Sequence, residues 1–157
     1  GAGSATGQQR HDGYLAALAG AGLSPIAQAL RPTVEEARAV ARNFLTRQKP
    51  LPDAIVASSG LILLGLVEAL RDAGLRYPDD IALAGFDDMP WTRLVTPAIT
   101  VVAQPTYEMG RAAIELLRAR IQQPDQVVRR VVLRGDLIVR ASSARPDGIL
   151  RPDPTGR

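Results

Sequence analysis

Three short polar stretches follow apolar segments of the chain: 58–60 (Ser-Ser-Gly), 86–88 (Phe-Asp-Asp) and 104–106 (Gln-Pro-Thr). A carboxylate such as that of Asp87 can accept two hydrogen bonds at once, from vicinal hydroxyls or from the edge of a base. The guanidinium of Arg10, near the start of an expected helix, offers a rigid fork of donors for hydroxyls or an anionic group. An acid, a basic fork and hydroxyls around an apolar cleft are what recognition of a small polar molecule requires.

The same side chains also have plainer interpretations. An aspartate pair after a strand usually caps a turn, as Asp87 and Asp88 would here. A lone arginine such as Arg10 is more often a surface charge, and His11 has no evident partner and is expected in solvent. The residues taken singly therefore leave a structural interpretation open beside ligand binding.

Catalysis is not expected from this sequence. The chain has no cysteine and a single histidine, His11, which excludes thiol chemistry, cysteine-rich zinc sites and multi-histidine metal sites. The adjacent acids at 79–80 and at 87–88 would point to opposite faces of an extended segment, so neither pair flanks one scissile bond. The glycines within residues 1–7 follow no strand, unlike those of a phosphate-binding loop. We expect no enzyme activity, no cofactor and no metal.

The elements that must position these residues alternate between helices and short apolar strands. A capping box from Thr33 to Glu36 predicts a helix start, and Gly74 predicts a helix end. Helices are expected at about 6–20, 34–49, 61–72 and 107–121, and strands at 26–30, 54–57, 81–85 and 99–103, with a final strand or hairpin over 127–133 and 137–139. The apolar residues expected to face inward from the last helix are Met109, Ala113, Leu116, Leu117 and Ile121.

This alternation predicts an α/β fold with a mostly parallel sheet flanked by helices. Ligands of such sheets bind at the carboxyl ends of the strands, where the three polar stretches would meet. The 157 residues allow one compact domain, which we place at 1–145. Residues 146–157, rich in proline, glycine and aspartate, are expected to form a disordered tail.

Charge and hydropathy limit the partners. The net charge is +3, but the arginines are spread along the chain and interleaved with acids, so no clustered DNA footprint is expected. The most apolar run, 61–70, contains Glu68 and is shorter than the ~20 residues of a membrane span. The first residues lack the basic and apolar regions of a signal peptide. We expect a cytoplasmic protein without a membrane partner.

Short stretches along most of the chain, up to about Arg145, stand in an order and spacing shared with one family. They include 52–57 (PDAIVA), 64–65 (LG), 69–75 (ALRDAGL), 78–81 (PDDI), 85–88 (GFDD), 100–102 (TVV), 104–105 (QP), 109–113 (MGRAA) and 137–143 (LIVRASS), with 10–14 and 21–23 nearer the start. Together they resemble the lactose-repressor (LacI/GalR) family of transcriptional regulators. The resemblance implies a type I periplasmic-binding-protein-like fold. It also implies that this chain is incomplete, without the helix-turn-helix headpiece and the first part of the effector-binding core.

The resemblance also assigns roles to residues. Arg10, with Thr6 one turn earlier, and Asp87 fall at positions where the family binds effector. Ser59 stands where many members have asparagine, and Pro32 stands where many have an aromatic residue. The expected effector-binding set is Thr6, Arg10, Pro32, Ser59, Asp87 and Gln104.

A dimer interface is implied for another part of the chain. The family places it on the helix that carries Leu64 and Glu68 and in the loop that carries Trp91 and Leu94. A large aromatic residue suits a buried anchor of such an interface.

The predicted function is the ligand-sensing part of a dimeric DNA-binding transcriptional regulator. A small polar effector, sugar-like or nucleobase-like, would control operator affinity, and DNA would be contacted only through the missing headpiece. This chain by itself would bind no specific DNA and would bind ligand weakly or not at all. The chief alternative is a solute-binding protein of a sugar transport system; an enzyme using the aspartate pairs and a functionless remnant are further alternatives.

Overall fold

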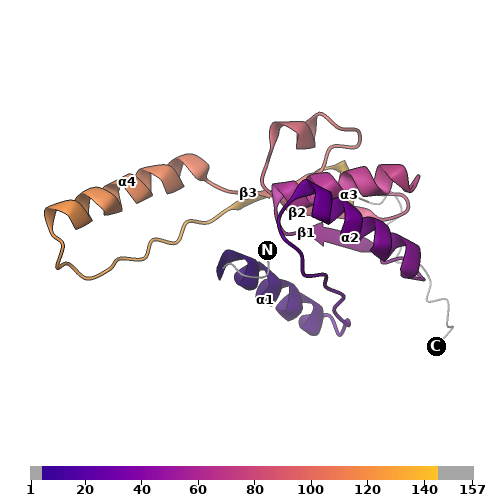
Figure 1. The fold of residues 1–157 in the computed structure, drawn as a ribbon, viewed down its shortest axis with the longest axis horizontal. Coiled ribbons are helices and arrows are strands. Elements are labelled where there is room, and N and C mark those ends of the chain that lie inside the picture. Colours follow the sequence, from indigo (N-terminus) through magenta and orange to yellow (C-terminus); the bar gives the residue numbers. More distant parts are fainter. Residues whose placement is uncertain (1–4, 145–157) are drawn as a thin grey trace.

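The computed structural model describes residues 5–144, which form a body and an arm that projects from it (Figure 1). The body contains a small sheet with helices beside it. The arm consists of α4 (Thr106–Gln122) and the segment 123–135, which returns toward the sheet. The predicted disordered tail, 146–157, lies outside the described residues.

The sheet has four strands in the order of the sequence: β1 (Ala54–Ala57), β2 (Ala82–Phe86), β3 (Thr100–Ala103) and β4 (Asp136–Ile138). The first three are parallel, and β4 runs antiparallel to β3 at the edge. The prediction of a mostly parallel sheet is confirmed. The carboxyl ends of β1, β2 and β3 therefore lie along one edge, as ligand-binding α/β sheets require.

Two helices cover the sheet in layers. α3 (Gly60–Asp72) packs on β1 and β2, and α2 (Val34–Arg47) packs on α3. The two helices approach closely at Gly65, which lies directly against the backbone of α2. The side chains that fill the core without exposure include Leu63, Leu70, Ile81, Leu83, Ile99 and Val101.

Local signals placed both helices correctly. The Thr33 hydroxyl accepts a hydrogen bond from the Glu36 amide at the start of α2, as the capping box predicts. The reciprocal half of the box is absent, because the Glu36 carboxylate accepts from the backbone amide and side chain of Arg31 instead. α3 ends at Asp72, and Gly74, which follows its C-cap Ala73, has a φ of 68° that suits glycine.

Two predicted strands are wrong. Residues 26–30 form no strand, and the Tyr14 hydroxyl bonds both the amide and the carbonyl of Ile26. Residues 127–133 also form no strand, because the ladder between β3 and β4 begins only at Asp136. Short apolar runs become strands only where a neighbouring strand receives their backbone hydrogen bonds.

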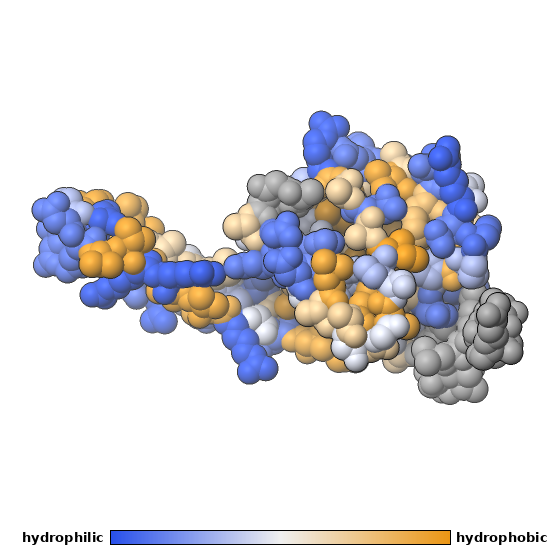
Figure 2. Space-filling view, turned by 90° about the horizontal axis from the view of Figure 1, so that it is seen from below, coloured by the Kyte–Doolittle hydropathy of each residue, from blue (hydrophilic) through white to orange (hydrophobic). Residues whose placement is uncertain are grey.

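The prediction that the apolar side of the last helix faces inward is also wrong. None of α4 is buried; Met109, Leu117 and Ile121 are 45%, 56% and 70% exposed. The helix has the predicted periodicity, but it projects from the body and no other element covers it (Figure 1). Figure 2 accordingly shows apolar side chains on the surface of the arm as well as on the body. In the described residues, no helix has the length and apolar character needed to cross a membrane.

Candidate functional site

Asp87 lies at the carboxyl end of β2 and is held from three directions. One carboxylate oxygen accepts a hydrogen bond from the Gly60 amide at 2.9 Å, and the other accepts from the Gln104 side chain at 2.5 Å. Its own amide donates to the Val102 carbonyl. The φ of Asp87 is 75°, a left-handed conformation that aspartate tolerates better than most residues. These bonds fix the carboxylate at the edge where β1, β2 and β3 end.

Arg10 reaches the same edge from α1 (Ala5–Gly20). Its guanidinium stacks on the ring of Phe86, 4.3 Å from the ring centroid, and donates to the Ser58 carbonyl at 2.5 Å. α1 buries no residue; Arg10 joins it to the end of β1, and the Tyr14 hydroxyl joins it to the segment that follows it, at Ile26. The stretches that follow β1, β2 and β3 thus meet one guanidinium and one carboxylate, a donor and an acceptor for a polar guest.

The other predicted effector-binding residues are placed less uniformly. Ser59 caps α3, because its hydroxyl accepts a hydrogen bond from the Ile62 amide. Thr6 lies one turn before Arg10 on α1, with an exposed side chain, and Pro32 is exposed in the segment before α2. The structure therefore brings Arg10, Asp87 and Gln104 to one edge, and ligand contact by Thr6, Pro32 and Ser59 stays a prediction.

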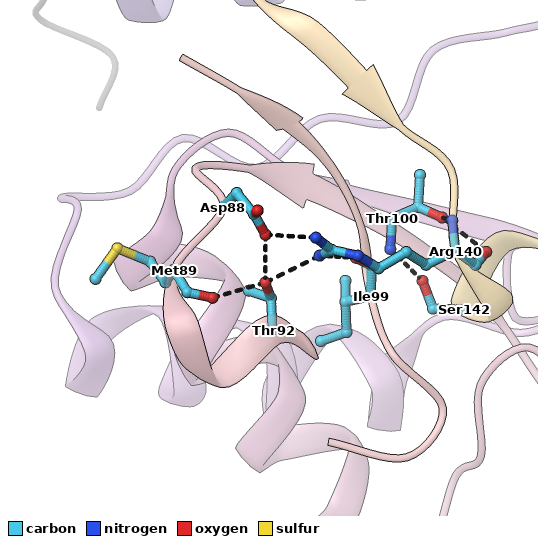
Figure 3. A network of polar contacts seen from close by, with 7 residues as sticks. All are labelled: Asp88, Met89, Thr92, Ile99, Thr100, Arg140 and Ser142. Atoms are coloured by element: carbon cyan, nitrogen blue, oxygen red, sulfur yellow. Dashed lines mark hydrogen bonds and ion pairs between the residues drawn. The ribbon is translucent and has the colours of Figure 1, made fainter. Parts of the chain in front are cut away.

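Sequence reasoning missed a network of polar side chains beside this edge (Figure 3). The Arg140 guanidinium donates to Asp88 at 2.7 Å, to the Thr92 hydroxyl and to the Ile99 carbonyl. Thr92, in the short helix η1 (Pro90–Arg93), also donates to Asp88. Asp88 and Arg140 are 52 positions apart, and only their places in the motif-like stretches 85–88 and 137–143 marked them in the sequence.

This network continues into the segment that follows β4. The Thr100 hydroxyl exchanges hydrogen bonds with the backbone of Arg140. Ser142, in the short helix η2 (Ala141–Ser143), accepts from the Thr100 amide and donates to the Leu83 carbonyl. In the described part of the chain, no buried side-chain polar atom lacks a hydrogen-bond partner. The segment after β4 is thereby tied to β2 and β3.

Comparison with known proteins decides the family. Residues 2–143 match the periplasmic binding protein-like domain. The chain belongs to that family.

Its relatives within the periplasmic binding protein-like family are regulators of the lactose-repressor type. The HTH-type transcriptional regulator KdgR of Bacillus subtilis is 38% identical over 108 residues, 69% of this chain and 32% of the regulator. A regulatory protein of the LacI family from Chloroflexus aggregans, 34% identical, superposes with a TM-score of 0.75, covering 90% of this chain and 52% of that one. A LacI-family regulator from an Arthrobacter species, solved with lactose, is 32% identical and superposes with a TM-score of 0.71. The match covers 83% of this chain and 48% of that regulator.

These matches confirm the resemblance to the lactose-repressor family and the periplasmic-binding-protein-like fold. They are transcriptional regulators rather than enzymes, and they do not favour the alternative of a transport protein. The chain spans about a third of the length of KdgR (32%). It spans about half of each solved chain, 52% of the Chloroflexus protein and 48% of the Arthrobacter regulator. Its partial coverage fits the predicted incomplete core.

The predicted dimer-interface residues of this family member differ in exposure. Leu94 is 79% exposed, whereas Trp91 is half-buried and packs against the core. Leu64 and Glu68 are half-buried on α3, and Glu68 lies 3.7 Å from the Arg38 guanidinium. Of the four, only Leu94 has most of its surface exposed, and the interface stays a prediction for all of them.

The ion pair of Asp88 with Arg140 predicts that the stability of the body depends on pH. Burial disfavours the charged carboxylate, but hydrogen bonds from Arg140 and Thr92 outweigh burial and lower the pKa of Asp88. A lowered folded-state pKa stabilises the folded state above the unfolded value, about 3.9 for aspartate, and this contribution is lost as the pH falls through the folded value. A hydrogen bond from Arg38 lowers the pKa of Asp72 with the same sign.

We therefore expect the contribution of Asp72 and Asp88 to the free energy of unfolding to stay nearly constant between about pH 5 and 7. This contribution should decrease as the pH is lowered below about 4. Urea unfolding at a series of pH values, followed by the fluorescence of Trp91, measures this dependence. Arg140→Met removes the partner of Asp88 and should give a shallower acid slope. Equal slopes for the two proteins would contradict the assignment of the slope to this pair.

Proposed function

We propose that this chain is the effector-sensing part of a DNA-binding transcriptional regulator and that its ligand is a small polar molecule, with sugars the first class to test. The observation that carries the proposal is the arrival of Arg10, Asp87 and Gln104 at one edge of a parallel sheet. That edge is where ligands of such sheets bind. In the same proposal the chain binds without catalytic turnover.

The chemistry of the edge suits a hydroxyl-rich ligand. A carboxylate has about four lone-pair sites, and Gly60 and Gln104 each occupy one on Asp87. The sites that stay open can accept from two hydroxyls, and the guanidinium of Arg10 has five N–H groups, not all of which Ser58 can take. One face of the Phe86 ring is already covered by Arg10, which leaves that face unavailable for stacking on a ligand. The Arthrobacter relative that was solved with lactose supports the same ligand class.

The whole regulator would act as a cytoplasmic homodimer. Leu64, Glu68, Trp91 and Leu94 would lie at the interface, and operator DNA would be bound through a helix-turn-helix headpiece. Ligand binding would shift the dimer geometry and so the operator affinity. Since the chain spans only part of its relatives, it would supply one side of the ligand cleft, and we expect its own affinity for a sugar to be weak.

Amide chemical shifts recorded during a titration with lactose can detect such weak binding. We expect shifts to concentrate at Gly60, Asp87 and Gln104, with saturation only at millimolar lactose, the regime of about −4 kcal/mol in binding free energy. Asp87→Asn keeps the shape and tolerates a positive φ, but it removes the charge and should abolish the shifts. Asp125→Asn, an exposed acid in the arm, is the matched control.

Two results would contradict the proposed function. In the first, lactose, cellobiose and ribose would all leave the amide chemical shifts of Gly60, Asp87 and Gln104 unchanged. In the second, lactose would still change these chemical shifts in Asp87→Asn.

A separate measurement tests DNA binding. At physiological salt the chain should not retain a DNA duplex in a sequence-specific manner, because its positive charges are dispersed.

A further inference from the structure

The two outer strands of the sheet differ in how well their open sides are protected against pairing with another chain. β4 spans only Asp136–Ile138 and begins with a charged residue, and short, charged outer strands pair poorly. β1 spans Ala54–Ala57 and consists of apolar residues only. Among the described residues, no strand pairs with the outer side of β1. That side, the open side of β1, can therefore accept a further strand.

The register shows which backbone groups lie on the open side of β1. The Ala82 amide donates to the Asp53 carbonyl, and Ala54 lies opposite Ala82 in the parallel ladder. Because successive residues of a strand direct their backbone groups to alternate sides, Ile55 faces β2, whereas Ala54 and Val56 face outward. The Val56 side chain is also 57% exposed, so nothing in the described structure blocks the approach of a strand there.

The arm contains a stretch with the complementary property, strand-forming residues without a strand to pair with. Residues 127–133, the arm segment, read Val-Val-Arg-Arg-Val-Val-Leu, and β-branched residues favour strands. All seven are exposed, with Val127 at 89% and Val132 at 77%. Within residues 5–144, the arm segment belongs to no strand. One chain thus carries both an unpaired strand-forming segment and an unpaired side of a sheet.

The arm segment and the open side of β1 lie on opposite sides of one molecule. The arm leaves the sheet after β3 and returns at β4, which is the far end of the strand order from β1. The ladder that pairs Ala103 with Asp136 fixes this return, and the arm projects away from the body (Figure 1). The arm segment is therefore placed to meet the open side of β1 in a second molecule rather than in its own.

Charge favours β1 over a second arm segment as the partner. Arg129 and Arg130 lie in the middle of the arm segment. If two arm segments paired antiparallel about their centres, the two Arg130 side chains would lie opposite each other, and like charges so placed destabilise a sheet. β1 contains no charged residue, so pairing with β1 avoids this repulsion.

We propose that two copies of this chain associate by strand addition, in which the arm segment of each copy pairs with the open side of β1 in the other. Main-chain hydrogen bonds supply the affinity, as in other complexes in which a segment extends a sheet. A two-fold arrangement makes the exchange reciprocal and closes the dimer with two equivalent pairings. The proposal goes beyond the proposed function, since it involves neither the ligand nor the predicted interface at Leu64, Glu68, Trp91 and Leu94.

Val56→Pro tests the open side of β1 without removing bonds to β2. Proline eliminates the outward N–H of residue 56, outer strands tolerate it at such positions, and Ile55 is already extended, as the residue before a proline must be. Sedimentation velocity over a series of protein concentrations gives the dissociation constant of the dimer. We expect Val56→Pro to raise this constant at least about ten-fold, because both equivalent pairings lose a hydrogen bond. Val56→Thr keeps the branched shape and the N–H, and should leave it nearly unchanged.

The arm segment is tested by a double variant, Val131→Pro with Val132→Pro. Adjacent residues of a strand direct their N–H groups to opposite sides, so one of the two prolines removes a donor to β1 in any register. Since the arm segment is exposed and forms no strand in the described structure, the body should fold as before. Alone, the double variant should associate as weakly as Val56→Pro.

An equal mixture of the two proline variants gives the sharpest result. Val56→Pro has an intact arm segment, and the double variant has an intact β1, so one of the two pairings can form between them. We expect the mixture to sediment faster than either variant alone at the same total concentration. An interface formed by one identical patch on both copies gives no such complementation.

Amide hydrogen exchange locates the contact in the wild type. In dilute protein, the amides of Ala54 and Val56 should exchange faster than those of Ile55 and Ala57, which face β2. A higher protein concentration should slow the exchange of Ala54, Val56 and the arm segment. Leu94→Asp, which alters the predicted dimer interface, should leave this pattern unchanged.

Several results would overturn the proposal. Exchange at Ala54 and Val56 would be independent of protein concentration, or already slow in dilute protein because the chain itself covers β1. Folded Val56→Pro would associate like the wild type, or the mixture would sediment like either variant alone. If Val56→Pro does not fold, the double variant must by itself abolish the concentration-dependent slowing at Ala54 and Val56, or the proposal is wrong. Lactose titrations test the proposed function separately.

Discussion

Gly65→Ala is expected to destabilise the protein by about 3 kcal/mol, the upper part of the usual range for overpacking. An added Cβ atom would lie 2.4 Å from the Val34 carbonyl oxygen, 2.7 Å from the Ala37 Cβ and 2.8 Å from the Arg38 amide nitrogen. These atoms belong to the backbone of α2 or are bound directly to it, so no side-chain rotation relieves the overlap. The two helices would have to separate, and the apolar contacts between them would be weakened.

Urea unfolding followed by Trp91 fluorescence measures the loss, and Gly110→Ala is the matched control. Gly110 lies within α4, where an added Cβ meets no atom within 4 Å. There the substitution should stabilise the helix by about 0.5–1 kcal/mol, because alanine favours helix more than glycine does. A Gly65→Ala protein as stable as the wild type would mean that α2 and α3 do not pack this closely.

Ser142→Ala is expected to cost about 2–3 kcal/mol, because it leaves two buried backbone groups without their partner. The Ser142 side chain is 0% exposed; its hydroxyl donates to the Leu83 carbonyl at 2.6 Å and accepts from the Thr100 amide at 2.8 Å. The hydroxyl thus joins β2, β3 and η2. The alanine methyl group fits the site but satisfies neither group, and water has no access to it.

Ser143→Ala provides the comparison for this prediction. Ser143 is exposed, and its hydroxyl contacts only the Thr100 hydroxyl at 2.7 Å, so its loss should cost less than about 1 kcal/mol. Thermal unfolding of both variants under one condition gives the difference. If the two substitutions cost the same, the hydroxyl of Ser142 does not have the bridging role that its contacts indicate.

Features encoded by neighbouring residues could be predicted from the sequence. The Thr33 cap and the glycine at 74 indicated the helices beside them, and the apolar runs before residues 58 and 86 predicted β1 and β2 within one residue of their ends. The location of the candidate site followed from these strands. Three polar stretches at the ends of parallel strands must lie at one edge of a sheet.

Features that depend on distant partners could not be predicted in this way. Residues 127–133 have the composition of a strand but no neighbour, and α4 has an amphipathic pattern with nothing opposite it. Periodicity reports which side of an element is apolar, not whether another element is present to cover it.

The candidate site shows the same limit. Gln104 was expected to bind effector, and the sequence did not reveal that its side-chain amide donates to Asp87. Ligand contact by Ser59 stays a prediction, and the sequence did not reveal that its hydroxyl caps α3. The ion pair of Asp88 with Arg140 spans 52 positions and depends on a strand that returns antiparallel after the whole arm. No local pattern encodes such a pairing.

The position of β4 and Ser142 near the end of the described chain has a consequence for biosynthesis. During translation, β1, β2 and β3 emerge from the ribosome before the arm, and β3 then has a free edge. The Leu83 carbonyl and the Thr100 amide must also wait for the Ser142 hydroxyl. The edge of β3 therefore stays open to unwanted strand pairing until the arm and β4 have been made, and a ribosome that stalls within the arm would leave a product with an unprotected sheet.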